Sequence, residues 1–147
     1  MTSLRSAVVR VTHRFAAPPE RVFDAWLDAD KMRAWMRGPA LHDEVLKATI
    51  DARVGGGFEY TVRRNGQVIE HYGSYREIDR PRRLVFTFEV KGMEGDAPSL
   101  VTLDFAEAGA GTELTLTHAG VLPEYAERTQ GGWTKILEAH AQSLAHR

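Results

Sequence analysis

The segment GGWTKILEAHAQSL, residues 131–144, decides the fold of this chain. Its apolar and aromatic side chains recur three and four positions apart, which is typical of an amphipathic helix with one buried face. The stripe consists of Trp133, Ile136, Leu137, His140, Ala141 and Leu144. Each of the two glycines at its entry costs a helix about 1 kcal/mol relative to alanine. We therefore expect the helix to bend at Gly131 and Gly132, or to approach its neighbours closely there.

The N-terminal part of the chain predicts one strand followed by two short helices. Residues 7–15 alternate loosely between apolar and polar side chains, as a half-buried strand does. We expect a helix to begin near Pro19, because a proline in the first turn loses no helical hydrogen bond. A second helix is expected over residues 31–36, with Asp28 and Asp30 as alternative capping residues.

Between residues 42 and 118 the sequence reads as a series of strands. Asn65-Gly66 is the strongest hairpin signal, because both central residues of the favoured turn need a positive φ. Apolar residues stand at every second position, and polar residues such as Thr87 and Glu89 stand between them. We expect one covered face and one wet face. The covered sets are Phe58, Tyr60 and Val62; Leu84, Phe86 and Phe88; Val101, Leu103 and Phe105; Leu114, Leu116 and His118.

This order of elements predicts the fold class. A strand, two short helices, a run of strands and a long amphipathic helix favour an α+β protein. We expect a curved antiparallel β-sheet wrapped around the long C-terminal α-helix, in the arrangement called a helix grip. The chain has the length of one ordinary domain, so we expect residues 1–147 to form a single domain.

Composition excludes several classes of function. The net charge of −1 removes the electrostatic basis for binding nucleic acid, which needs a concentrated basic surface. The absence of cysteine excludes a disulfide framework, a thiolate zinc site and a cysteine nucleophile. No stretch approaches the roughly 20 apolar residues of a membrane span. We expect the protein to be cytoplasmic. We expect it to be a monomer or a homodimer.

Five segments together resemble a known family. They are FAAPPERVFDAWLDADKMRAWMRGP (residues 15–39), GGGFEY (55–60), GSYREIDRPRRLVFTF (73–88), GTELTLTHAGV (111–121) and GGWTKILEAH (131–140). In this order they resemble the START-like, or SRPBCC, superfamily. The branch is the one similar to the C-terminal domain of activators of the heat-shock chaperone ATPase. The resemblance implies a helix-grip fold with a cavity between sheet and helix, and it implies a chaperone as an alternative partner.

Two departures from the family pattern lie where that cavity would open. Many relatives have a second tryptophan beside the one at Trp35, where this chain has Met36. Relatives also often carry a histidine shortly before the Gly-Trp pair, whereas this chain has Thr129 and Gln130. Pocket details of relatives therefore do not carry over to this chain.

Large aromatic side chains are the main candidates for a ligand site. They pack the sheet against the helix, and some of them are expected to line a cavity for an apolar or aromatic molecule. The predicted lining residues are Trp35, Phe58, Tyr60, Phe86, Phe88, Leu103, Phe105, Leu116, His118, Trp133 and Leu137. His118, at the end of its strand, either orients a ligand, acts as a general base or is hydrogen-bonded at the rim of the core.

The sequence favours binding over catalysis. The histidines lack metal-ligand spacing, and neither a nucleophile elbow nor a phosphate-binding loop is present, so we expect no metal, no cofactor and no catalytic residue. We predict a binding module for a hydrophobic or aromatic small molecule, lipid-like or polyketide-like. Two alternatives remain: a partner of the chaperone ATPase, and a cyclase or hydrolase that uses His118 with Tyr60, Tyr72 or Glu59.

Overall fold

A computed structural model describes residues 7–37, 44–94 and 98–145, with side chains except at residues 34–37, 143 and 145. The elements are β1 (Ala7–Phe15), α1 (Pro19–Ala25), α2 (Ala29–Arg37), β2 (Glu44–Ile50), β3 (Gly57–Arg64), β4 (Gln67–Asp79), β5 (Arg83–Val90), β6 (Ser99–Ala108), β7 (Gly111–Val121), the 3₁₀ helix η1 (Pro123–Tyr125) and α3 (Ala126–Ala145).

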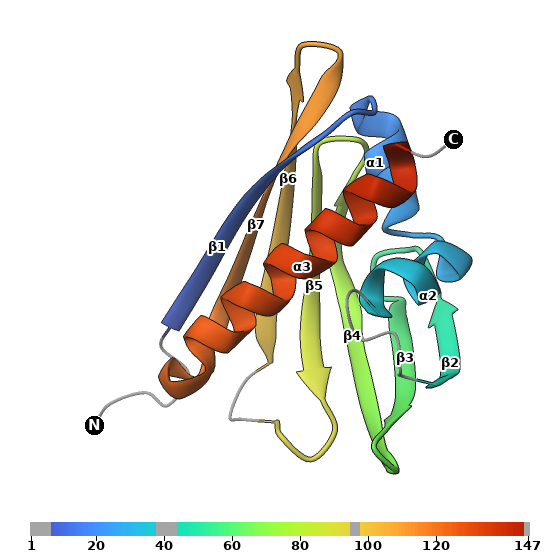
Figure 1. The fold of residues 1–147 in the computed structure, drawn as a ribbon, viewed down its shortest axis with the longest axis vertical. Coiled ribbons are helices and arrows are strands. Elements are labelled where there is room, and N and C mark those ends of the chain that lie inside the picture. The colour runs from blue at the N-terminus through green and yellow to red at the C-terminus, as the bar shows by residue number, and fades with distance from the viewer. Residues whose placement is uncertain (1–6, 38–43, 95–97, 146–147) are drawn as a thin grey trace.

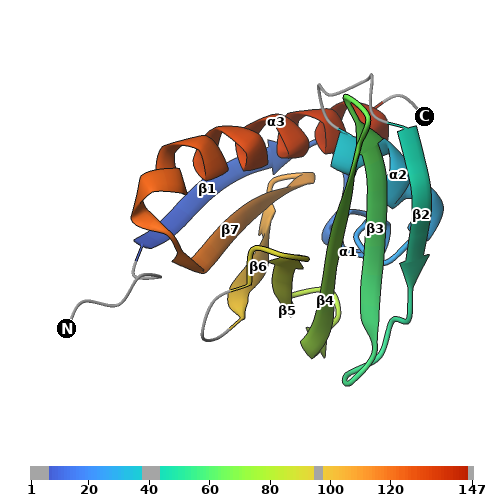
Figure 2. The same ribbon diagram turned by 90° about the horizontal axis from the view of Figure 1, so that it is seen from below.

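The strands form one seven-stranded sheet in the order β1-β7-β6-β5-β4-β3-β2, and every neighbouring pair is antiparallel. Helix α3 runs diagonally across the sheet (Figure 1). Seen from below, the sheet curves into a trough, and α3 lies along its open side (Figure 2). The predicted α+β helix-grip fold is confirmed.

The N-terminal helices begin where local chemistry favours them. Pro19 occupies the first turn of α1, as predicted. Asp28 is the residue that caps α2, because its Oδ1 accepts the backbone N–H of Asp30 at 2.9 Å and that of Lys31 at 3.2 Å. Helix α2 begins two residues earlier than the sequence predicted, because Asp28 caps it and Asp30 lies within its first turn.

The predicted hairpin joins β3 to β4. Asn65 has a φ of 53° and Gly66 a φ of 80°, so both central residues take the left-handed conformation that this turn needs. The turn sets the register of the two strands, in which Tyr60 lies opposite His71. The turn chemistry thus places the inward-facing side chains of β3 and β4 on one face.

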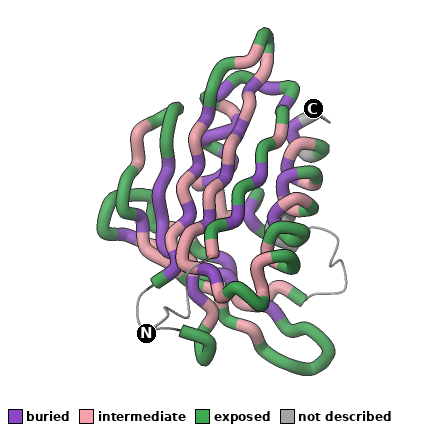
Figure 3. The backbone as a smooth tube through the Cα atoms, turned by 90° about the vertical axis from the view of Figure 1, so that its left-hand side faces the viewer, coloured by how far each residue is buried: buried purple, intermediate pink, exposed green. Residues whose placement is uncertain are grey.

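The core lies between the concave face of the sheet and one stripe of α3. Trp133, Leu137, His140 and Leu144 are buried, as the periodicity predicted. Buried segments alternate with partly and fully exposed ones along the strands (Figure 3). The C-terminal end of α3 is held by Arg21, whose guanidinium donates to the Leu144 carbonyl oxygen at 2.7 Å. Helix α1 therefore helps to fix α3 over the sheet.

One expectation about local packing is wrong, and one alternative of a second expectation is excluded. Strand β5 is not wet on its second face, since Val85, Thr87 and Glu89 are all buried. At Thr87 the reason is the close approach of β4, where the Ser74 backbone N–H donates to Thr87 Oγ1 at 2.8 Å and a Cβ at Gly73 would clash with the Thr87 carbonyl oxygen. Gly131 and Gly132 lie within α3, exposed and with open space where a Cβ would stand. Close approach therefore does not explain these glycines, and the alternative, a bend of the helix at this point, stays a prediction.

Among residues 7–37, 44–94 and 98–145, no helix combines the length and the apolar character needed to span a bilayer.

His140 is a titratable group on the buried face of α3. It is 1% exposed, and its ring contacts those of Phe15 and Trp26 at centroid distances of 5.3 and 5.1 Å. Burial lowers the pKa of His140 from 6.5 to about 4, against the opposing effect of a hydrogen bond with the Val22 backbone. Between these two pH values the unfolded chain binds the proton and the folded chain does not. Stability is therefore full above pH 6.5 and falls as the pH drops towards 4.

We predict that His140→Leu removes this loss, which amounts to up to about 3 kcal/mol for such a shift. Urea unfolding at pH 7 and pH 4.5 measures it for both proteins. His13→Leu on β1 is the control and should lose stability on acidification as the wild type does. Equal losses in wild type and His140→Leu would contradict the prediction.

Candidate functional site

A small cavity lies between the sheet and α3, and we call it the inner cavity. It has a volume of about 20 Å³, which is room for about one water molecule. Its walls come from α2, β3, β4, β5, α3 and the residue that follows α1, and they are almost entirely apolar. They are formed by Trp26, Met32, Phe58, Tyr75, Phe86, Phe88 and Trp133.

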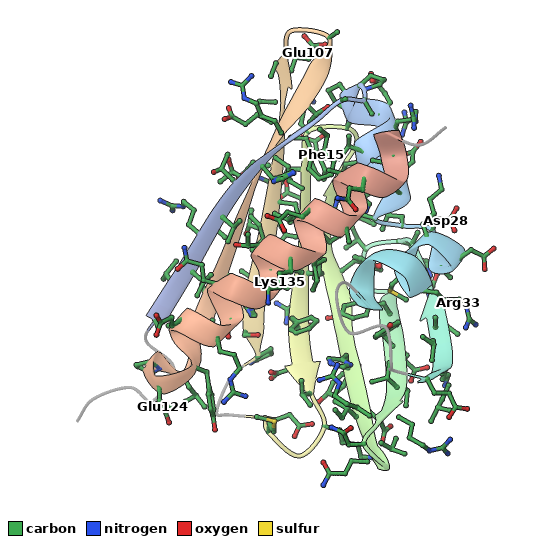
Figure 4. The ribbon with its side chains drawn as sticks, in the orientation of Figure 1. Phe15, Asp28, Arg33, Glu107, Glu124 and Lys135 are labelled. Atoms are coloured by element: carbon green, nitrogen blue, oxygen red, sulfur yellow. The ribbon has the colours of Figure 1, made fainter. Side chains whose placement is uncertain are left out.

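A larger space opens where β5 and β7 end and where β6 and α3 begin, and we call it the outer pocket. Its volume is about 130 Å³. Figure 4 labels Glu124, in η1, at this end of the molecule. Most of the lining is apolar, with a few polar groups at one side. The lining residues are Phe88, Glu89, Val90, Met93, Ser99, His118, Val121, Leu122, Tyr125 and Thr129.

A chain of hydrogen bonds forms the floor of the outer pocket. The indole Nε1–H of Trp133 donates to His118 Nδ1 at 3.0 Å. His118 Nε2 lies 2.9 Å from Ser99 Oγ, and the Ser99 hydroxyl donates to the Phe88 carbonyl oxygen. All three side chains are at most 5% exposed. Helix α3 is thereby bonded to β7, and β7 is bonded through β6 to β5.

The indole determines the direction of every bond in this chain. An indole N–H can only donate, so His118 Nδ1 accepts and carries no proton. The neutral ring therefore has its proton on Nε2 and donates it to Ser99 Oγ. Ser99 in turn uses its own proton for the carbonyl oxygen of Phe88. One tautomer of His118 is selected by its neighbours.

This arrangement does not activate a nucleophile or a base. In serine-type catalysis the histidine nitrogen accepts the proton of the serine hydroxyl, whereas here the serine accepts from the histidine. The unprotonated nitrogen of His118, Nδ1, already accepts a hydrogen bond from the Trp133 indole. The geometry supports the sequence interpretation of His118 as a hydrogen-bonded residue at the rim of the core, not that of a general base.

The predicted site residues fall into three groups. Phe58, Phe86, Phe88 and Trp133 line the inner cavity, and His118 lies with Phe88 at the outer pocket. The side chain of Trp35 lies outside the described residues. The others are buried in the core and line neither space, so their contact with a ligand stays a prediction: Tyr60, Leu103, Phe105, Leu116 and Leu137.

Sequence reasoning missed Ser99 and most of the outer pocket. Ser99 lies two residues before Val101 on β6 and opposite Phe88 in the register, so strand parity could have placed it on the inner face. Leu122, Tyr125 and Thr129 follow the last strand, and no periodicity marked them. Within the described parts of the chain, no three histidine, aspartate or glutamate side chains gather closely enough to hold a metal ion.

Comparison with known proteins identifies the family. The sequence model of the family described as activator of Hsp90 ATPase homolog 1-like protein matches residues 16–145. The chain belongs to this family. The match spans both helices of the N-terminal part, the sheet from β2 to β7 and α3, and so includes every residue that lines the two spaces. The chain matches none of the curated protein sequences with which it was compared.

Solved structures share the whole fold. A protein from Chromobacterium violaceum superposes with a TM-score of 0.79 at 24% identity, covering 92% of this chain and 94% of that one. An AHSA1-like protein from Aeromonas hydrophila gives a TM-score of 0.77 at 21% identity, with 92% and 90% covered. An HSP90 activator from Plasmodium falciparum gives a TM-score of 0.72 at 26% identity, with 94% and 96% covered.

We predict that Trp133→Phe releases the tautomer of His118. The substitution keeps an aromatic ring but removes the donor that holds Nδ1 as an acceptor, and it should cost about 1–2 kcal/mol of stability. Nitrogen-detected NMR of the imidazole should show the Nε2–H form in the wild type and a mixture in the variant.

Ser99→Ala is the matched control, because it removes the partner of Nε2 and leaves the indole bond at Nδ1 intact. It should keep the Nε2–H form. An unchanged imidazole spectrum in Trp133→Phe would show that the indole does not select the tautomer.

Proposed function

We propose that this chain binds a small apolar or aromatic molecule, about the size of one ring, in the outer pocket. The observation that carries the proposal is this open pocket of about 130 Å³ with mainly apolar walls. An engineered apolar cavity of about 150 Å³ in another protein binds benzene. A space of this kind suits one ring, with Ser99 and Thr129 at hand to bond a single polar substituent.

The polar floor supports binding without chemical change. The indole, the imidazole and the hydroxyl of the floor each use their donor within the protein. A ligand therefore meets a surface whose donors are all used within the protein. Ser99 Oγ accepts one hydrogen bond from His118, and its second lone pair can accept one from a ligand. A proton-transfer reaction would first have to break the bond between Trp133 and His118.

The size of the two spaces restricts the class of ligand. At about 20 Å³ the inner cavity holds a water-sized molecule. The lipid-like or polyketide-like ligand expected from the sequence does not fit there while Phe88 and Trp133 keep their positions. We therefore assign the ligand to the outer pocket. We also propose that residues 1–147 form a single domain and that the protein acts in the cytoplasm.

The test is a titration with one-ring compounds, such as toluene and p-cresol, followed by NMR of the Trp133 indole and by calorimetry. Burying about 200 Å² of ring surface at about 25 cal/mol per Å² gives about 5 kcal/mol, or a Kd near 0.2 mM. Thr129→Trp should fill the pocket and abolish binding.

Lys135→Trp is the matched control, since Lys135 is exposed six positions farther along α3 and lines neither space (Figure 4). It should bind as the wild type does. The proposal fails if no one-ring compound shifts the Trp133 signal, or if both tryptophan variants bind equally well.

A second proposal is a chaperone partner. It is supported by the family and by the 26% identity to an HSP90 activator over 94% of this chain. A pull-down with the cognate Hsp90-type chaperone and an assay of its ATPase test it directly. Stimulation of the ATPase that persists in Thr129→Trp would support a partner role independent of the outer pocket. Absence of both binding and stimulation would rule the role out.

A further inference from the structure

One residue borders both spaces. Phe88 is the one residue shared by the described linings of the inner cavity and of the outer pocket. It lies on β5 opposite Ser99 of β6, at the end of the strand where the outer pocket opens. Its ring is partly exposed, whereas Phe86, two residues earlier on the same face, is buried and lines the inner cavity only.

Aromatic rings surround Phe88. The ring stands almost perpendicular to His118, at 88° and 5.7 Å between centroids, and it lies 5.5 Å from the Trp133 ring. On another side it stacks on Phe58, at 21° and 6.1 Å. Phe58 and Trp133 both line the inner cavity, and His118 lines the outer pocket. The Phe88 ring therefore stands between aromatic residues of the two linings, at a position that we call the passage.

The neighbours of Phe88 are held more firmly than Phe88 itself. His118 and Trp133 are joined by a hydrogen bond of 3.0 Å, and turning either ring would break it. The Phe88 side chain has no polar atom, and it turns about two torsions. It can leave the passage at the cost of ring contacts alone, while its backbone carbonyl keeps the bond from Ser99.

We infer that Phe88 is the specificity-determining residue that sets the upper size limit of the ligand. The inference rests on the proposed function. With Phe88 in the passage, a ligand occupies the outer pocket alone and is limited to one ring. With a small residue in its place, the outer pocket joins the inner cavity, and the aromatic wall of Phe58, Tyr75 and Phe86 can receive a second fused ring.

The experiment compares two probes, p-cresol with one ring and 2-naphthol with two, on the wild type, Phe88→Ala and Phe86→Ala. The two variants delete the same atoms from the same face of β5. Phe86→Ala enlarges the inner cavity without opening it to the outer pocket. We expect Phe88→Ala to bind 2-naphthol about tenfold more tightly than the wild type does, because the second ring gains buried apolar area. Phe86→Ala should bind it as the wild type does.

Equal affinities of Phe88→Ala and Phe86→Ala for 2-naphthol, with both variants folded by circular dichroism, would overturn the inference. If Phe88→Ala does not fold, Phe88→Leu replaces it, and it should still exceed the wild type in the ratio of 2-naphthol to p-cresol affinity. Failure of the wild type to bind p-cresol counts against the proposed function. The comparison of the two alanine variants still decides the role of Phe88.

Discussion

The burial of α3 in the concave side of the sheet is the contact on which the rest of the structure depends. The inner faces of the strands carry large apolar side chains that must be covered, and α3 is the long element that covers them. Trp133, Leu137 and Leu144 supply the contact, and burying a side chain of this size contributes about 1.5–3 kcal/mol. The bond from Arg21 to the Leu144 carbonyl ties α1 to the same arrangement.

This packing also decides where space remains between the sheet and α3. Along most of its length α3 fills the concave side of the sheet so well that the inner cavity keeps only about 20 Å³. Space remains at the end where β5 and β7 stop and α3 begins, because no further turn of helix covers the sheet there. The bond between Trp133 and His118 closes the floor of that space. The larger of the two spaces in this helix grip therefore lies at its end and not at its centre.

The family and the fold do not by themselves define a ligand. Structures at 24% and 21% identity keep the fold over nine-tenths of the chain, and one fold hosts many unrelated functions. The features of this chain on which the proposed ligand depends are local. One is the direction of the hydrogen bonds from Trp133 through His118 to Ser99, which the Trp133 indole sets. The other is the ring of Phe88, which borders two spaces of different size. Both depend on aromatic side chains, whose shape and polarity make contacts directional.

The sequence by itself determined the elements and the fold class. The spacing of Trp133, Leu137 and Leu144 is a property of one helix, and the positive φ of Asn65 and Gly66 is a property of one turn. Such signals act over a few residues, so they can be read without knowing what lies opposite.

Only the tertiary structure decided the site. Ser99, His118 and Trp133 come from β6, β7 and α3, and their hydrogen bonds depend on the strand register and on the rotation of α3 about its axis. The burial of Thr87 depends on β4, and the volume of each space depends on side chains from several elements at once. Distances between segments remote in the chain are set by packing, and no local spacing encodes them.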